Sequence, residues 1–296
     1  MSKYTIGAIN QLMVKREAPF GVYLEAGTGS TGDDILLPTG SMVLSDGAAL
    51  TLGDEVSVFI YRDSEDRIIA TMNPPLITLG EVRLLEVVGG NASGAFVSIG
   101  LERDVFVPNK EQKYPLEKGR RYLFKLYVDK TQRLAATVDV YGALPLPVPG
   151  QFSTGQMVEA RIVGRQQNGA LQAAIDDQWK AVLFASEYFE DVQPGDVLPA
   201  KILKFLDDGK PSLTLRKDLK SERLDLKGEI LTALKQAGGT IPYNDRSTPD
   251  EIRARFKTSK NYFKMALGNL MKEGKIRQDE AGTHLLQPPV QEGPKA

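Results

Sequence analysis

The stretch that decides the fold runs from Gly80 to Asp139. It begins GEVRLLEVVGGNASGAFVSIGLERDVFVP at residue 80 and resumes as KGRRYLFKLYVDKTQRLAATVD at residue 118. Short runs rich in β-branched and aromatic residues alternate here with turn-forming glycine, asparagine and aspartate, which is typical of β-strands joined by tight loops. The stretch contains five such runs. It therefore predicts five short strands in one small unit.

The same pattern recurs on both sides of this stretch. Gly7, Gly80 and Gly155 each open a long strand, at spacings of 73 and 75 residues. An internal repeat of this kind means that one structural unit is used three times. The second strands also align, as GVYLE from Gly21, GAFVS from Gly94 and GALQA from Gly169, which places Leu171 where the second unit has Phe96. The repeat predicts three tandem five-stranded OB barrels, and thus a mostly β chain.

The apolar period changes from two to about 3.6 residues after Glu222, which indicates helices. The first helix carries Leu226, Ile230 and Leu234 on one face, and Thr248-Pro249-Asp250-Glu251 has the form of a capping box that starts a second helix. A third helix is expected from near Ser259, and a short hairpin follows it. Its apolar face is expected to consist of Phe263, Leu267, Leu270 and Met271. Three helices and a hairpin predict a C-terminal winged helix.

Composition shifts and prolines suggest where the domains end. Pro145, Pro147 and Pro149 alternate along one connection, which favours an extended spacer that is exposed to solvent. The expected domains are a first barrel at 1–73, a second barrel at 76–140, a proline-rich linker at 141–153, a third and divergent barrel at 154–218, a winged helix at 222–287 and a disordered tail at 288–296.

The chain lacks the residues that several classes of function require. The chain has no cysteine, and its one histidine, His284, has no second histidine or thiolate with which to share a metal. Gly27-x-Gly29-x-x-Gly32 matches a dinucleotide fingerprint in form only, because a short strand ending at Pro38 follows it instead of a helix. No signal peptide or membrane span is evident. We expect a cytoplasmic protein with no catalytic residues, cofactor, metal or membrane partner.

Charge is distributed unevenly along the chain. The net charge is −1 overall, but residues 1–75 carry −5, residues 76–148 carry +2, residues 149–221 carry −1 and residues 222–296 carry +3. A polyanionic partner is therefore better met by the second barrel and the C-terminal segment than by the first barrel.

The barrels provide candidate nucleic-acid contacts. Alternate residues of a strand face opposite ways, so placing Ala95 and Val97 in the core turns Phe96 outward. OB barrels bind single strands by stacking bases on such aromatic residues, with basic side chains along the phosphates. Phe106 is expected in the core. The candidate barrel residues are Phe96, Tyr23, Arg83, Arg103 and Tyr127, with Arg83 and Arg103 expected beside Phe96. The alternative is that Phe96 or Tyr23 packs against a neighbouring barrel.

The winged helix provides a second candidate surface. Lysine and asparagine suit contacts to phosphates and base edges. The candidates on and just before the third helix are Lys257, Lys260, Asn261, Lys264 and Lys272. The alternative is a solvated helix in a module that only docks on protein.

The order of these motifs resembles a known family. The opening glycines, SGAFV, VFVP and the D-x-x-x-R turn from Asp129 to Arg133 resemble S1-like RNA-binding domains. Three such units followed by a winged helix containing SKNYFKMALGNLMKEGKI resemble the bacterial conserved virulence factor B family. The resemblance implies an RNA-binding protein that regulates gene expression after transcription, with single-stranded RNA as its partner. A DNA-binding transcription regulator and a protein-interaction scaffold remain as alternatives, and the oligomeric state is left open.

Overall fold

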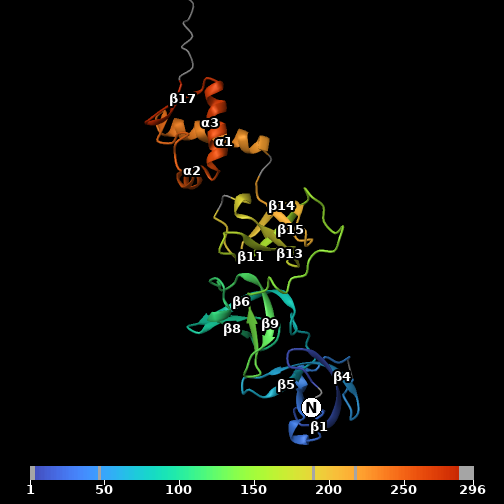
Figure 1. The fold of residues 1–296 in the computed structure, drawn as a ribbon. Helices are drawn as coiled ribbons and strands as arrows, with labels where there is room; N and C mark the ends of the chain where they lie inside the picture. The colour runs from blue at the N-terminus through green and yellow to red at the C-terminus, as the bar shows by residue number, and fades with distance from the viewer. Residues whose placement is uncertain (1–3, 46–47, 189–190, 217–218, 287–296) are drawn as a thin grey trace, which may run out of the picture. The chain divides into compact units, whose positions relative to one another are not determined.

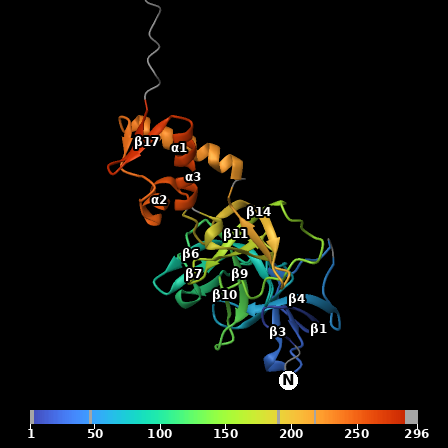
Figure 2. The same cartoon turned by 45° about the horizontal axis from the view of Figure 1, so that its top comes forward.

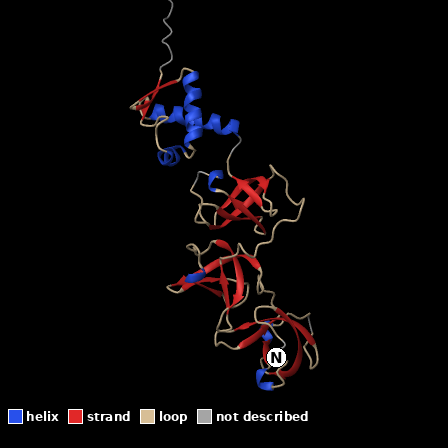
Figure 3. Ribbon diagram, viewed as in Figure 1, coloured by secondary structure: helices blue, strands red, loops and turns tan. Residues whose placement is uncertain are grey.

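The computed structural model describes residues 4–45, 48–188, 191–216 and 219–286. Strands dominate up to Thr214 and helices follow (Figure 1). Figure 3 shows this change directly, as red strands followed by blue helices. The expected tail at 288–296 lies outside the described residues.

Three closed barrels of five strands each make up the β part. The strands of the first barrel are β1 (Ile9–Ala18), β2 (Gly21–Leu24), β3 (Ile35–Pro38), β4 (Glu55–Arg62) and β5 (Ile68–Thr71). Those of the second are β6 (Val82–Asn91), β7 (Gly94–Val97), β8 (Val105–Pro108), β9 (Arg121–Val128) and β10 (Leu134–Thr137). Those of the third are β11 (Met157–Arg165), β12 (Leu171–Ile175), β13 (Trp179–Leu183), β14 (Val197–Phe205) and β15 (Pro211–Thr214).

Each barrel closes in the same way. The first strand pairs with the second and the fourth, and the fifth pairs with the third and the fourth. In the second barrel, for example, β6 pairs with both β7 and β9, and these strands lie together in the second view (Figure 2). This is the predicted OB topology. The repeated opening glycines have a backbone reason, since Gly7, Gly80 and Gly155 all have φ between 82° and 85°, where other residues are strained.

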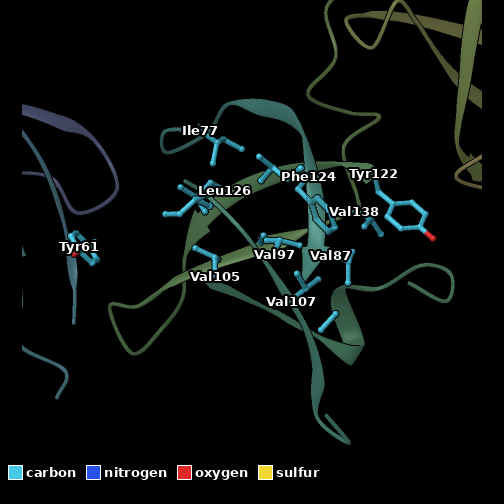
Figure 4. Packing of buried hydrophobic residues seen from close by; sticks show 14 of the residues in the cluster. Tyr61, Ile77, Val87, Val97, Val105, Val107, Tyr122, Phe124, Leu126 and Val138 are labelled. Carbon is cyan, nitrogen blue, oxygen red and sulfur yellow. The ribbon is translucent and has the colours of Figure 1, made fainter. Parts of the chain in front are cut away.

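The core of the second barrel follows the predicted alternation. Ala95, Val97, Val105 and Val107 are all buried in one cluster with residues of β6 and β9. Figure 4 shows Val97, Val105 and Val107 pointing into the same space as Phe124 and Leu126. Phe106 lies between two core valines and is only half-buried, so its expected place in the core is wrong. Because side chains alternate along a strand, the inward valines turn Phe106 outward.

The third barrel corrects the alignment of the second strands. Gly89 pairs with Phe96 in the second barrel, whereas the glycine at the matching bulge of the third, Gly164, pairs with Gln172. Gln172 is therefore the structural counterpart of Phe96. Leu171 is fully buried. The sequence alignment that matched Leu171 with Phe96 is therefore wrong by one residue. The third barrel still has no aromatic residue at the position of Phe96, because Gln172 occupies it.

The first and second barrels are joined through packed side chains. Phe59 and Tyr61 of β4 belong to the buried cluster of the second barrel. Figure 4 shows Tyr61 at the left, on the ribbon of the first barrel. Arg62 Nε donates to the Gln132 carbonyl at 2.9 Å, and Arg133 Nε donates to Asp66 Oδ1 at 2.9 Å. We call this set of contacts the barrel joint. It places the turn at 63–66 of the first barrel beside the turn at 129–133 of the second.

The proline-rich connection is only partly the exposed spacer that its sequence suggested. Leu144 is 4% exposed and packs with Leu123, Val140, Val163 and Ala174. The Pro145 carbonyl also accepts a hydrogen bond from the Lys180 amide at 2.9 Å. Leu146 and Val148 are exposed, at 39% and 61%. The first half is thus held at Leu144 by apolar packing, whereas the second half has no such buried anchor.

The C-terminal domain has the predicted winged-helix elements. They are α1 (Leu219–Gln236), α2 (Pro249–Phe256), α3 (Lys260–Lys272), β17 (Ile276–Asp279) and β18 (Gly282–Leu285), with β16 (Thr240–Ile241) as an additional strand pairing with β18. Thr248 and Glu251 form the capping box that starts α2. The buried face of α3 is Phe263, Ala266, Leu267 and Leu270. Met271 is 46% exposed, so its assignment to the apolar face is wrong.

Candidate nucleic-acid interface

The outer face of the second barrel presents a pair of phenylalanines. Phe96 of β7 and Phe106 of β8 are cross-strand partners, with ring centroids 5.3 Å apart and planes inclined by 46°. Each ring is half-buried, and each strand turns its neighbouring residues into the core. Tilted aromatic pairs of this kind are favourable contacts that leave ring surface available. The predicted outward orientation of Phe96 is confirmed, and Phe106 joins it.

The residue opposite Phe96 decides whether its ring is accessible. In the second barrel this residue is Gly89, which has no side chain. In the first barrel the matching pair is Arg16 and Tyr23, and the Arg16 guanidinium lies 3.4 Å from the centre of the Tyr23 ring. Tyr23 faces outward as expected, but a cation already occupies its face. The open aromatic face is therefore a property of the second barrel.

A cleft of about 420 Å³ adjoins the phenylalanine pair. Its walls come from the second barrel and from the barrel joint. The cationic residues among them are Arg62, Arg103 and Arg133, the carboxylates are Asp66, Asp104 and Asp129, and Tyr61 lies on the side of the first barrel. Arg103 is exposed, as a phosphate-binding side chain must be. The cleft therefore combines stacking surface with cationic side chains, of which Arg62 and Arg133 are held by hydrogen bonds.

Two of the acids in the cleft are held by neighbours. Asp129 Oδ1 accepts hydrogen bonds from the Thr131 and Arg133 amides at 2.7 and 3.0 Å. Asp66 accepts one from Arg133, and this hydrogen bond lowers the pKa of Asp66. Both carboxylates are therefore ionised at neutral pH; Asp66 holds the Arg133 guanidinium at the cleft, and Asp129 holds the Arg133 amide. The sequence contains the D-x-x-x-R turn but does not mark Arg133 as a candidate, because its partner Asp66 lies 67 residues away.

The other barrel candidates are not gathered at this cleft. Arg83 pairs across the sheet with Phe124, whereas Phe96 pairs with Gly89 on the same strand. Six residues of strand separate these positions, or about 20 Å at 3.3 Å per residue. The expectation that Arg83 lies beside Phe96 is wrong. Tyr127 faces outward from β9, and its burial, with the nearby carboxylates of Glu111 and Asp129, raises its pKa.

The winged-helix candidates lie on or beside the free side of α3. Asn261, Lys264 and Lys272 are exposed and lie away from the buried stripe. Lys260 is half-buried at the first turn, and Lys257 is exposed at the end of α2 in a left-handed conformation, with φ 48°. Lys264 and Lys272 form no ion pair with any residue in the described part of the chain. The surface is basic, and it also exposes Met265 and Met271.

The described residues also bear on other kinds of site. Within residues 4–45, 48–188, 191–216 and 219–286, no group of three or more histidine or acidic side chains is arranged to hold a metal ion. None of the helices described is long and apolar enough to cross a membrane. The dinucleotide-like Gly27–Gly32 segment leads into a three-residue 3₁₀ turn, as expected for a loop.

The fold and these surfaces define a protein of tandem S1-type barrels with a C-terminal winged helix. A family model for the S1 domain matches residues 6–73, and one for the CvfB-like winged helix domain matches residues 228–285. The protein YitL of Bacillus subtilis is 30% identical over 290 residues, covering 92% of this chain and 91% of that one. Conserved virulence factor B of Staphylococcus saprophyticus is 27% identical over 86% of each chain. The chain belongs to the conserved virulence factor B family.

A solved structure is similar to this chain over most of its length. It is described as a multidomain protein with nucleic acid binding domains from Streptococcus pneumoniae, and it is 26% identical in sequence with a TM-score of 0.51. The alignment covers 95% of this chain and 98% of that one. S1 and winged-helix domains are the domain types found here, and both support nucleic-acid binding.

Proposed function

We propose that this chain is a non-enzymatic protein that binds single-stranded RNA in the bacterial cytoplasm and regulates gene expression after transcription. The observation that carries the proposal is the phenylalanine pair of the second barrel. It is open because Gly89 faces it, and it adjoins a cleft that contains Arg103 and Arg133. An aromatic face takes any unstacked base, and arginines beside it contact the phosphates of the same strand.

Single-stranded RNA suits this surface better than duplex. The bases of a duplex are stacked on one another and present only their edges, so a ring such as Phe96 has no base face to cover. The first barrel is a poorer candidate because Arg16 covers Tyr23, and the third lacks an aromatic at the matching Gln172. The proposed site is therefore centred on the second barrel.

The test is photocrosslinking of the full chain to a short single strand containing 4-thiouridine, followed by identification of the modified peptides. We expect the label on the segments 94–108 and 129–135. A matched duplex should compete poorly. Labelling confined to the winged helix would contradict the proposed site, and stronger competition by duplex than by single strand would contradict the proposed ligand.

A DNA-binding transcription regulator led by the winged helix is the second candidate. It is favoured by one observation, the exposed Asn261, Lys264 and Lys272 on α3, since helices with such side chains contact base edges and phosphates in a major groove. Duplex DNA that binds more tightly than single-stranded RNA would support it.

A further inference from the structure

The strand that carries Phe106 also presents a carboxylate on the same face. Asp104 precedes β8 directly and lies two residues before Phe106, so alternation turns both side chains outward while Val105 points into the core. Residues two apart on a strand are roughly 7 Å apart along it. Asp104 lines the same cleft as Phe96 and Phe106. A base stacked on the pair would therefore have its edge near this carboxylate.

Asp104 differs from the other two acids of the cleft in having no partner among the residues that the structure describes. Asp66 is held by Arg133, and Asp129 by the amides of its own turn. Asp104 is exposed, and it forms no hydrogen bond or ion pair with any residue among those that the structure describes. An ionised carboxylate only accepts hydrogen bonds, through two oxygens. Its accepting capacity is therefore free for a ligand.

The hydrogen-bond donors on the edge of a base decide whether it can bind to the Asp104 carboxylate. Guanine, adenine and cytosine each carry an exocyclic amino group that donates hydrogen bonds, and acidic side chains accept from such groups. Guanine also places its ring N–H beside the amino group, so that one carboxylate can accept from both. Uracil presents carbonyl oxygens on both sides of its single ring N–H, and these repel a carboxylate.

We propose that Asp104 makes this site select bases with an amino group, guanine foremost, over uracil. The inference rests on the proposed function, because it requires a base to stack on Phe96 and Phe106. It goes beyond that function by assigning a preference to a site in which stacking alone would be indifferent to sequence.

The chain offers a matched control for Asp104. Asp34 occupies the same position in the first barrel, directly before β3, and lines a cleft of that barrel with Tyr23. The Tyr23 ring is covered by Arg16, so no base is expected to stack there. Asp104→Asn and Asp34→Asn remove the same charge. Only the first change should alter base preference.

The experiment measures affinities of the full chain for short oligouridine strands that carry one central guanosine, adenosine, cytidine or uridine. Fluorescence anisotropy at one fixed salt concentration serves for all four. A good contact to a base edge discriminates by about 5- to 150-fold. Because this rim is exposed to solvent, we expect about five- to tenfold tighter binding of the guanosine strand than of the uridine strand. Asp104→Asn should reduce this ratio to about twofold or less, whereas Asp34→Asn should leave it unchanged.

Each result has a definite meaning. If the wild-type chain binds all four strands equally, or prefers uridine, the inference is wrong while single-strand binding stands. If Asp104→Asn tightens all four strands to the same degree as Asp34→Asn, the carboxylate acts only by its charge and the inference is again wrong. Failure of the wild-type chain to bind any of the strands would overturn the proposed function itself.

Discussion

The open face of Phe96 can be closed by one substitution, Gly89→Arg. In the first barrel an arginine at the matching position lies 3.4 Å from the tyrosine ring, which is the distance a stacked base would itself need. A Cβ added at Gly89 meets no atom within 4 Å, and Gly89 does not have a positive φ, so the backbone accepts a side chain there. The variant reproduces in the second barrel the arrangement seen in the first.

Gly89→Arg is expected to weaken RNA binding although it adds a positive charge. A base stacked on an aromatic ring contributes about 1–3 kcal/mol, so covering the ring should weaken binding by about 5- to 150-fold. The same substitution adds a positive charge, which by itself strengthens binding to a polyanion. Loss of affinity despite a more positive protein is therefore the result that stacking requires.

The assay is titration of a labelled single-stranded RNA with the full chain, combined with a melting temperature for each variant. Gly89→Ala leaves the ring open and should bind as wild type does. Gly142→Arg adds the same charge in an exposed part of the linker, where an added Cβ also meets no atom within 4 Å, and should bind slightly more tightly. If Gly89→Arg is folded and binds RNA as tightly as Gly142→Arg does, Phe96 does not stack a base.

Four other experiments, three with variants and one by proteolysis, test separate parts of the structure. Reversing Lys260, Lys264 and Lys272 to glutamate should make the slope of log affinity against log salt shallower by about 2, at roughly 0.7 per phosphate contact, if α3 meets single-stranded RNA; an unchanged slope in a folded variant would remove α3 from the interface. Gly94→Ala should cost about 1–3 kcal/mol of stability, measured by denaturant unfolding, because its Cβ would lie 2.3 Å from the Val107 carbonyl oxygen. Hydrogen bonds from His284 and Arg277 lower the pKa of Asp279 to about 2, so Asp279→Asn should lower the melting temperature by a constant amount above about pH 5, and the difference should vanish as the pH falls from about 4 to 2, since the folded-state pKa lies below the unfolded one. Limited proteolysis should cut the linker at 146–151 before it cuts 141–145 or any barrel, and early cuts within 80–139 would contradict the proposed domain boundaries.

The architecture was predictable because local and repeated signals agree. The glycines that open each unit have left-handed backbones, which few other residues accept, so they recur at fixed spacing. Alternation along β7 located Ala95, Val97 and Phe96 correctly, and the capping box at Thr248 located α2. Each of these features depends on neighbours within a few residues.

The candidate site was harder to predict because it depends on pairing between distant segments. The bulge between Val87 and Gly89 decides which residue faces Phe96, and periodicity carries no trace of it. A single-residue shift in the alignment put Leu171 where Gln172 belongs, since shifting a strand by one residue exchanges its two faces. Arg133 needed its partner Asp66 in the preceding repeat. A single sequence does not show the register in which strands pair or the contacts between repeats, and the candidate site depends on both.

The barrel joint has a practical consequence for anyone who divides this protein. Phe59 and Tyr61 are 0% and 7% exposed, and both belong to the core cluster of the second barrel. A fragment that ends after the first repeat would uncover these two aromatic rings, and a fragment that begins at the second would lose the aromatic residues that pack against its core cluster. Uncovered apolar surface of this kind promotes self-association. We therefore expect a fragment that contains the first or the second repeat alone to aggregate, so a fragment of this chain should keep these two repeats together.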